Sequence, residues 1–351
     1  MTIQEIFNIA IKEKASDIHL IVGSVPMLRI DGQLTEMIGA IDRMERKEIE
    51  NLIFSIITPS QKTLFLHDRG LDFGYEMENG SRFRINIFFE KDNQGLVARL
   101  ISDDIPVLDT LGLPPVMMDI LNLRQGLILV TGPTGCGKTT TLAAMIDYIN
   151  EKRRANIITL EDPIEFIFKP KNSIIMQRQL DNDMLSFADG LRQAMRQDPN
   201  VIMVGEMRDL ESIATTITLA ETGHLVFATL HTYSAAQTID RIIDIFPPHQ
   251  QNQIRQQLSS VLACVVSQRL LPRNSGGRVA AREILINNPA VANLIRESKI
   301  TQIRNVIETS SRVGMVSMDQ DIKRIFKEQL ITREVAQNHM ENPETLEKIF
   351  G

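Results

Sequence analysis

The sequence predicts an α/β protein of two domains, a small α+β domain followed by a larger α/β domain with a central parallel sheet. Its 351 residues are enough for two ordinary domains, and 43% hydrophobic with 23% charged residues is the balance of a folded soluble chain. Short β-rich stretches with turn signals dominate the N-terminal part, whereas buried strands alternate with helices after it. We expect the first domain over residues 1–103, a linker over 104–120 and the second domain over 121–351.

Charge and cysteine content exclude several classes of protein. The net charge of −6 lacks the broad positive field of a non-specific nucleic-acid binder, so we expect no nucleic-acid partner. Two cysteines, Cys136 and Cys264, rule out a four-cysteine zinc site or a disulfide framework within one chain. Glu5 and Lys12 argue against a signal peptide, and no apolar run reaches the ~20 residues that span a bilayer. The sequence therefore predicts a cytoplasmic protein.

The N-terminal domain should open with an amphipathic helix and continue as an antiparallel sheet. Apolar residues recur at helical spacing between Ile3 and Ile11. Asp31-Gly32 and Asn79-Gly80 are turn signals, and the second lies between two β-rich stretches, which predicts a hairpin. The expected extended stretches are Asp17–Val22, Met27–Leu34, Leu71–Met77, Arg82–Phe89 and Gly95–Ile101.

The linker is expected where Pro106, Gly112, Pro114 and Pro115 interrupt regular structure. After it, continuous apolar runs alternate with helical patterns, which predicts a parallel sheet covered on both faces. From about His249 onward we expect mostly helices. The expected strands are Leu127–Val130, Asn156–Leu160, Val201–Val204 and Leu225–Thr229, and the helices between them include Thr139–Asn150, Ser186–Gln197 and Leu210–Thr222.

A late helix is predicted from its capping residues. Asn288 suits the N-cap and Pro289 suits the first helical position. Apolar and polar residues then fall on opposite sides of this helix. The buried face should hold Val291, Leu294 and Ile295, and the face available to a partner should hold Asn293, Arg296 and Glu297.

The strongest motif for function is a phosphate-binding loop between the run ending at Val130 and a helical pattern. It matches G-x-x-x-x-G-K-[ST]. Its glycines let backbone N–H groups point at phosphate oxygens, the lysine reaches the β/γ-phosphates and the threonine hydroxyl ligates Mg²⁺. A chance match would lack this strand–loop–helix context, so we expect ATP binding. The residues of the loop are Gly132, Pro133, Thr134, Gly135, Cys136, Gly137, Lys138 and Thr139.

Two acidic segments supply candidates for the general base. Val201–Val204 is followed by Gly205 and Glu206, and Glu206 could hold Mg²⁺ through water or activate the attacking water. Asn156–Leu160 is followed by Glu161, Asp162 and Glu165, and Glu165 is the rival for the base. Clustered carboxylates are costly unless something positive lies among them. The alternative for Glu206 is a solvated glutamate after a strand, and the alternative for the second segment is a solvated acidic turn.

Two histidines flank the strand predicted over Leu225–Thr229. Seven residues separate His224 from His231, so the strand could begin after one and end before the other. A histidine near the nucleotide phosphates could sense them, although a lone histidine is more often structural.

Together these four segments resemble the type II/IV secretion ATPase superfamily, which drives type II secretion and type IV pili. Its Walker A, Asp box, Walker B and His box match Gly132–Thr139, Glu161–Glu165, Val201–Glu206 and Gly223–His231. Within the superfamily the chain most resembles the PilT family of twitching-motility retraction ATPases, through the run Glu206–Glu211 and the short N-terminal region. Assembly-type relatives generally carry a four-cysteine zinc module, which this chain cannot form.

The resemblance implies a RecA-like ATPase domain, a PAS-like N-terminal domain and a helical C-terminal region. It also implies a hexameric ring that uses ATP and Mg²⁺ and acts on an inner-membrane pilus platform protein, at the inner face of the cytoplasmic membrane. It favours a nucleotide-binding role for His224 and His231 over a structural one. In this family arginines of the N-terminal domain complete the nucleotide site, and the matching candidates are Arg82, Arg84 and Arg99, for which a solvated sheet face is the alternative.

One position departs from the family pattern. The motif Ala-Ile-Arg-Asn-Leu-Ile-Arg-Glu of PilT proteins has Ala292 in place of its first arginine, and Arg304 follows as a possible substitute. The departure leaves open an accessory PilU-like role beside a paralogous retraction ATPase. A non-catalytic regulatory ring is a further alternative, opposed by the presence of both Lys138 and Glu206, and a nucleic-acid motor is opposed by the acidic charge.

Overall fold

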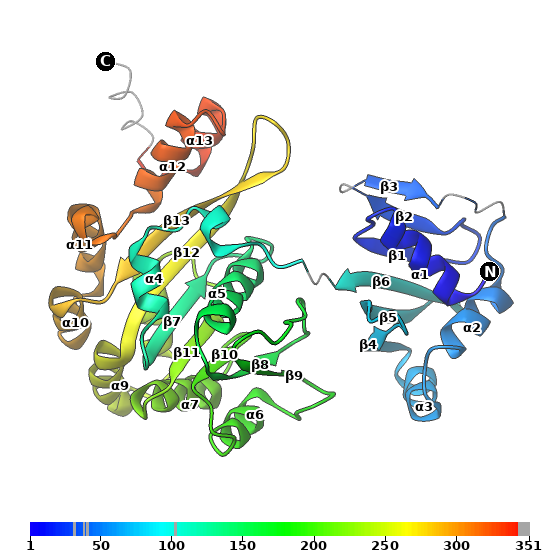
Figure 1. Cartoon of the computed structure of the whole chain (residues 1–351), viewed down its shortest axis with the longest axis horizontal. Coiled ribbons are helices and arrows are strands. Elements are labelled where there is room, and N and C mark those ends of the chain that lie inside the picture. The colour runs from blue at the N-terminus through cyan, green and yellow to red at the C-terminus, as the bar shows by residue number, and fades with distance from the viewer. Residues whose placement is uncertain (31–32, 38, 40–41, 102–103, 343–351) are drawn as a thin grey trace. The chain divides into compact units, whose positions relative to one another are not determined.

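The computed structural model describes residues 1–30, 33–37, 39, 42–101 and 104–342 of the chain. These residues divide into two compact units. The first unit holds residues 1–103 together with Glu165–Ile167, and the second holds the remainder. Within the described ranges no helix is long and apolar enough to cross a bilayer. Figure 1 labels the elements of both units.

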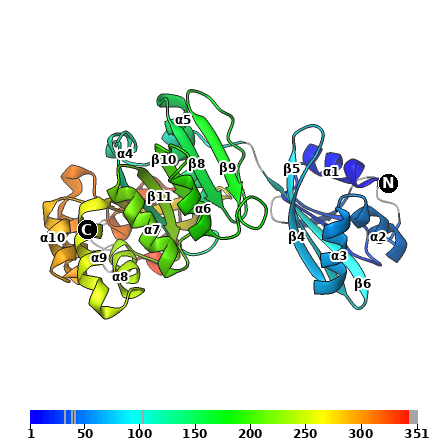
Figure 2. The same ribbon diagram turned by 90° about the horizontal axis from the view of Figure 1, so that it is seen from below.

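The first unit is a six-stranded antiparallel sheet with three helices (Figure 2). Strand order is β3-β2-β1-β6-β5-β4, and the Asn79-Gly80 turn joins β4 to β5 as predicted. The predicted Asp31-Gly32 turn lies outside the described residues. The elements are α1 (Ile3–Lys12), β1 (Asp17–Leu20), β2 (Met27–Ile30), β3 (Gln33–Glu36), α2 (Arg46–Phe54), α3 (Pro59–Asp68), β4 (Gly70–Glu76), β5 (Arg82–Glu90) and β6 (Asn93–Ile101).

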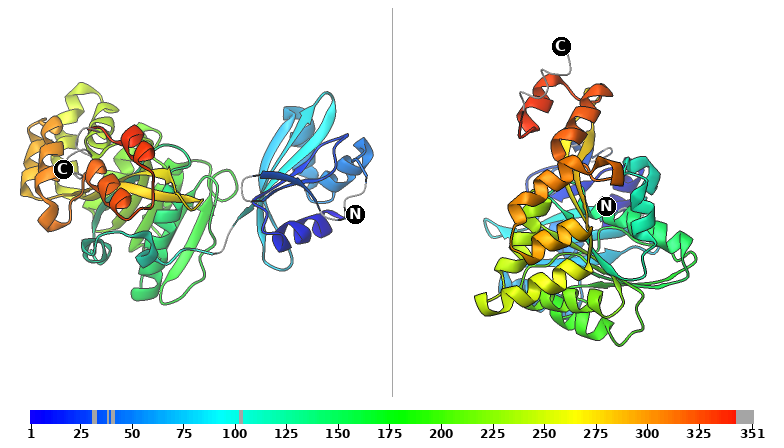
Figure 3. Two further views of the ribbon diagram at one scale, coloured as in Figure 1. Left: turned by 90° about the horizontal axis from the view of Figure 1, so that it is seen from above. Right: turned by 90° about the vertical axis from the view of Figure 1, so that its left-hand side faces the viewer.

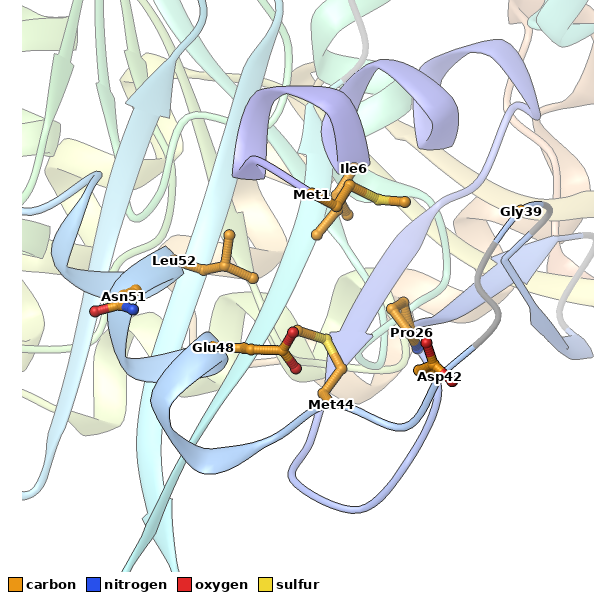
Figure 4. A pocket seen from close by; sticks show the side chains of 9 residues that line it. All are labelled: Met1, Ile6, Pro26, Gly39, Asp42, Met44, Glu48, Asn51 and Leu52. Carbon is orange, nitrogen blue, oxygen red and sulfur yellow. The ribbon is translucent and has the colours of Figure 1, made fainter.

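Alternation along the strands of this unit separates a core face from a polar face. Phe83, Ile85 and Ile87 of β5 are fully buried and pack in one cluster with residues of α1, α2 and α3. Arg82 and Arg84 alternate with them on the same strand and therefore lie on the other face. The first unit also contains a hollow of about 420 Å³ between α1, α2 and the chain before α2, shown in Figure 4.

The second unit is built on a seven-stranded sheet of order β13-β12-β7-β11-β10-β8-β9. All neighbouring pairs except β12–β13 are parallel. The first part of this unit contains η1 (Leu108–Leu111), α4 (Val116–Leu121), β7 (Gly126–Thr131), α5 (Lys138–Lys152), β8 (Asn156–Glu161), β9 (Ile174–Gln179), α6 (Phe187–Ala194), β10 (Val201–Val204), α7 (Leu210–Glu221) and β11 (Leu225–Leu230). The stretch expected as a linker thus holds η1 and all of α4 except its last residue.

Helices cover both faces of the larger sheet. The main apolar cluster joins one face to α6, α7, α8 and α9, while α4 and α5 lie on the other face (Figures 1 and 2). The β7 strand is buried along its whole length, as expected for a central parallel strand. This arrangement confirms the predicted α/β fold with its RecA-like second domain.

The region after His249 is mostly helical, as expected, but two long strands that the sequence did not predict follow α9. β12 (Leu262–Pro272) pairs parallel with β7, and β13 (Arg278–Ile286) returns antiparallel beside it. The apolar run Leu262–Val266 is too short for its period to distinguish a buried strand from a buried helix, and Ser267, Gln268 and Arg269 then interrupt it. The helical elements that follow β11 are α8 (Ala235–Asp244), α9 (Pro248–Val261), α10 (Pro289–Arg296), η2 (Ile300–Gln302), α11 (Ile303–Thr309), η3 (Ser311–Val313), α12 (Met318–Lys327) and α13 (Arg333–His339).

The C-terminal helices form a small second core on the strand pair. Leu271 and Ala281 of the two strands pack with Ile322 and Ile325 of α12 and Ala336 of α13. Figure 3 shows α12 and α13 against the end of this hairpin. The β12–β13 pair therefore connects the helical C-terminal region to the strand that carries the phosphate-binding loop.

Candidate functional site

The four predicted functional segments meet at one edge of the larger sheet. Strands β7, β11, β10 and β8 are neighbours in that order and run parallel, so their carboxyl ends line the same edge. The phosphate-binding loop follows β7 and His231 follows β11. Glu206 follows β10 after one intervening glycine, and Asp162 follows β8. Residues far apart in the sequence are thus brought together by strand order alone.

The phosphate-binding loop is closed by its own lysine. Lys138 is the first residue of α5, and its Nζ donates to the carbonyl oxygens of Gly132 at 2.9 Å and Pro133 at 3.1 Å. Gly135 and Gly137 have φ values of +75° and +87°, which favour glycine. A positive side chain and the N-terminus of α5 therefore face the loop, as an anion site requires. Thr139 is the second residue of α5 and is half-buried.

Gln268 of β12 braces the loop, a role that the sequence did not predict. Its Nε2 donates to the carbonyl oxygen of Cys136 at 2.8 Å, and its Oε1 accepts from the Thr141 hydroxyl at 3.0 Å. A Cβ atom at Gly132 would overlap the carbonyl oxygen of Gln268. Burial raises the pKa of the Cys136 thiol, which keeps this cysteine of the loop protonated. No signal at Gln268 could have identified its role, since the strand that carries it was not predicted.

Glu206 lies at the centre of the charged groups of this edge. Its carboxylate pairs with Arg208, and its Oε2 lies 3.4 Å from Nε2 of His231. Arg208 also approaches Asp162, with Nη2 3.5 Å from Oδ2. The hydrogen bond to Glu206 raises the pKa of Arg208. The structure thus pairs Glu206 with His231 at the sheet edge that carries the loop, and it adds Arg208, which the sequence marked only as part of a family motif.

Glu161 and Glu165 of the same acidic segment are placed differently. Glu161 is 4% exposed and accepts hydrogen bonds from Thr159 at 2.6 Å and Gln177 at 3.1 Å. Glu165 is exposed and belongs to the short segment that groups with the first unit. Of the two candidate bases, Glu206 is the one that follows a strand of the sheet edge that also carries the phosphate-binding loop.

Within a single chain, His224 lies far from the phosphate-binding loop. His224 precedes β11, and its carbonyl oxygen accepts from Gly126, the first residue of β7. The loop follows the last residue of β7, at the opposite end of an extended strand that spans about 20 Å. The Nδ1 of His224 instead lies 2.9 Å from the carbonyl oxygen of Leu219. The two histidines flank one strand, as the spacing predicted, and for that reason they cannot share a site in one subunit.

The candidate arginines lie on the polar face of the first unit. Arg84 and Arg99 are directly opposite each other on β5 and β6. The Nε of Arg84 donates to Asp72 at 3.2 Å, and the Nε of Arg99 donates to Asp17 at 2.8 Å. Arg82 pairs with Glu76 at 2.8 Å. The side chain of Arg99 remains 68% exposed, so its guanidinium has free donors.

The donor set fits Mg²⁺ held largely by phosphates and water. Within the described ranges, no group of three or more His, Cys, Asp or Glu side chains could hold a metal ion. Mg²⁺ at nucleotide sites keeps several waters and takes few protein ligands, so such a group is not required. The Thr139 hydroxyl at the start of α5 and the Glu206 carboxylate are the groups available here for direct and water-mediated contact.

Comparison with known proteins agrees with this arrangement. The family model described as "Type II/IV secretion system protein" matches residues 1–348. The type IV pilus retraction ATPase PilT of Pseudomonas aeruginosa is 43% identical over 344 residues, which cover 98% of this chain and 99% of that protein. The chain belongs to the type II/IV secretion system protein family. As a member of this family with a complete phosphate-binding loop, the chain is an ATPase of the PilT type.

Two further relatives of this secretion ATPase are informative. A twitching motility protein of Neisseria gonorrhoeae is 46% identical and covers 92% of this chain and 86% of its own length. The type IV pilus ATPase PilU of Pseudomonas aeruginosa is 32% identical, and the match covers 99% of this chain and 90% of that protein. A crystal structure of the pilus retraction motor PilT with bound ADP superposes with a TM-score of 0.93, at 44% identity and 99% coverage of both chains. The chain is thus more similar to the PilT relative than to PilU from the same organism.

Proposed function

We propose that this ATPase is a hexameric motor that retracts type IV pili and thereby drives twitching motility. The observation that carries the proposal is the meeting of the phosphate-binding loop, Glu206 and His231 at one sheet edge, in a chain similar to PilT over nearly its whole length. Hydrolysis in a ring would move the two units of each subunit and turn an inner-membrane pilus platform protein. The motor would then work in the cytoplasm, at the inner face of the membrane.

Each group at the edge has a role in the proposed reaction. Lys138 would exchange its bonds to the loop carbonyls for bonds to the β- and γ-phosphates. Glu206 would accept the proton of the attacking water, and His231 beside it would respond to the γ-phosphate. Bound Mg²⁺ would neutralise charge on the phosphates. Arg84 or Arg99 would complete the site by balancing charge that develops on the transferred group.

Replacing Lys138 tests the site. Lys138→Ala should abolish ATP turnover while leaving the fold intact, because it removes the charge that reaches the phosphates. Lys152→Ala, at the exposed far end of the same helix, is the matched control and should keep normal turnover. Near-normal hydrolysis by Lys138→Ala would reject this site.

Pilus imaging tests the cellular role. In a strain lacking the gene, labelled pili should extend but fail to retract, and the unsubstituted gene should restore retraction where Lys138→Ala does not. A PilU-like accessory role is the second candidate, suggested by Ala292 and the PilU relative. It predicts that the gene restores retraction only when a paralogous retraction ATPase is also present. Restoration in a strain lacking every such paralogue would exclude it, and absence of turnover in purified protein would favour a non-catalytic ring.

A further inference from the structure

A layer of buried polar side chains lies beneath the turn that carries His231. Its members come from β7, the turn after β11, α8, β12 and β13, and each is at most 8% exposed. Buried polar groups cost free energy unless they are hydrogen-bonded, so a shared layer of them constrains the elements that supply them. The layer contains Thr131, Thr232, Thr238, Ser267 and Glu283.

Hydroxyl groups connect the end of β7 to the turn after β11. Thr131, immediately before the phosphate-binding loop, has its Oγ1 2.8 Å from Oγ of Ser267. The Thr238 hydroxyl lies 2.6 Å from that of Thr232 and 3.5 Å from that of Thr131. It also donates to the carbonyl oxygen of Ser234 at 2.7 Å. Thr238 therefore contacts both the residue next to His231 and the residue next to Gly132.

Glu283 fixes the other side of the same turn. Its Oε1 accepts from the backbone N–H of Ala235, the first residue of α8, at 2.7 Å. The carboxyl group thus lies at the N-terminus of this helix, where backbone N–H groups lack partners inside the helix. Glu283 is directly opposite Ser267 on β13 and β12, so the contact joins the turn to the strand pair. Residues 232–235 are held between Glu283 and Thr238.

The held turn directly follows His231, whose Nε2 lies 3.4 Å from Oε2 of Glu206. This separation is already near the limit of about 3.5 Å beyond which hydrogen bonds weaken. A shift of the turn would therefore break the contact between His231 and Glu206. Burial raises the pKa of Glu283 and the charge of Glu341 acts in the same direction, while the hydrogen bond from Ala235 and the charges of Arg269 and Arg304 oppose the rise. The contact with Ala235 needs only an acceptor oxygen, so a neutral side-chain amide could accept the same bond.

We propose that Glu283 is a positioning residue for ATP hydrolysis. Acting through Ala235 and the Thr232–Thr238 contact, it holds His231 at the distance from Glu206 and the phosphate-binding loop that turnover requires. The inference rests on the proposed function, in which Glu206 and His231 act on ATP. It adds a residue of the β12–β13 pair that no motif of the sequence singled out.

The test compares two substitutions of Glu283 with a control. Glu283→Ala should lower kcat about tenfold and change KM less than about twofold, because the bound nucleotide still meets an intact loop while His231 is displaced. Glu283→Gln should stay within about twofold of the unsubstituted chain, since its amide oxygen can accept from Ala235. Glu334→Ala, an exposed carboxylate on α13, should change neither constant. Melting temperatures show whether each variant is folded at the assay temperature.

A second substitution covers the case in which Glu283→Ala does not fold. Thr238→Val removes the bridging hydroxyl at nearly constant shape and should also lower kcat with little change in KM. In the double variant the two losses should be less than multiplicative, because both act through one turn. Multiplicative losses, unchanged kcat in Glu283→Ala, or failure of Glu283→Gln to retain turnover would each overturn the positioning role. Absence of turnover in the unsubstituted chain would instead overturn the proposed function.

Discussion

Gly132 stands where the chain leaves β7, and a side chain there would overlap the backbone of Gln268. Its φ of +143° also lies in the region that favours glycine. Gly135 shares a positive φ of +75°, but a Cβ atom there would meet nothing within 4 Å. Both glycines therefore have a positive φ that would strain a side-chain-bearing residue, but only Gly132 lies too close to a neighbouring strand to accept a Cβ atom.

This difference makes a matched pair of substitutions. Gly135→Ala should weaken nucleotide binding by roughly fivefold, from about 1 kcal/mol of left-handed strain. Gly132→Ala should weaken it at least about tenfold further, because the loop must move away from β12 as well. Titration with a fluorescent ATP analogue measures both affinities. Equal effects of the two substitutions would show that the contact with Gln268 does not shape the loop.

Glu206 is the candidate general base because the second unit places it beside His231. Glu206→Gln should still bind ATP but hydrolyse it at least ~10²-fold more slowly, which is the scale of losing a positioned base. Separate measurements of nucleotide affinity and steady-state turnover distinguish the two effects. Glu165→Gln serves as the rival substitution, and arrest by that change alone would exchange the two roles.

At the scale of elements, we expect α10 to couple the motor to its pilus partner. Asn288 caps it by accepting from the N–H of Val291 at 2.9 Å, and Pro289 is its first residue, as predicted. Val291 and Ile295 are fully buried and Leu294 packs against the same cluster. Asn293, Arg296 and Glu297 are exposed, although Asn293 donates to Glu297 at 2.9 Å. The predicted two-sided helix is confirmed.

The exposed face of α10 carries one charge fewer than the family motif. Ala292 is half-buried one turn before Arg296, and Arg304 is engaged with Glu308 and Glu341. Arg296→Ala should impair pilus retraction in cells while ATP turnover in solution changes less than ~3-fold, under ~0.7 kcal/mol of barrier. Retraction imaging and a turnover assay on the same variant give both results, with Arg333→Ala on α13 as control. Normal retraction would show that α10 is only a solvated surface helix. A large loss of ATP turnover would instead show that it belongs to the catalytic core.

At the scale of the whole molecule, the proposed ring must supply an arginine to each site. Arg84 and Arg99 lie side by side on the first unit, whereas the phosphate-binding loop belongs to the second. Burial alone would raise the pKa of Asp17, but hydrogen bonds from Ser16 and Arg99 hold it below its ordinary value. Arg99 is therefore anchored through its Nε while the rest of its guanidinium remains exposed.

Mixed rings test whether the arginine acts across a subunit boundary. Arg84→Ala or Arg99→Ala, mixed with Lys138→Ala, should recover part of the activity that each variant lacks alone, because some interfaces then combine an intact loop with an intact arginine. Turnover is measured over a range of mixing ratios, with ring formation checked by light scattering. No recovery at any ratio, in rings of verified size, would place the arginine in its own subunit or outside the site.

The sequence by itself determined the local chemistry of this protein. Some features depend only on neighbours within a few residues and can therefore be predicted from the sequence. They include the glycines and Lys138 of the loop, the N-cap of α10 and the Asn79-Gly80 hairpin. Central strands such as β10 were also predicted within a residue of their bounds, because burial on both faces requires continuous apolar runs. The family motifs then fixed which chemistry these elements serve.

Only the tertiary structure decided which distant residues share a site. His224 and His231 belong to one sequence motif but flank one strand. Because an extended strand holds its ends about 20 Å apart, the two histidines lie at different places in the molecule. The run that forms β12 became a strand because β7 offered it an unpaired edge, and this pairing brought Gln268 to the loop and Glu283 to the His231 turn. Strand order is a long-range property, since each pairing depends on which backbone edges remain unsatisfied after the others have formed.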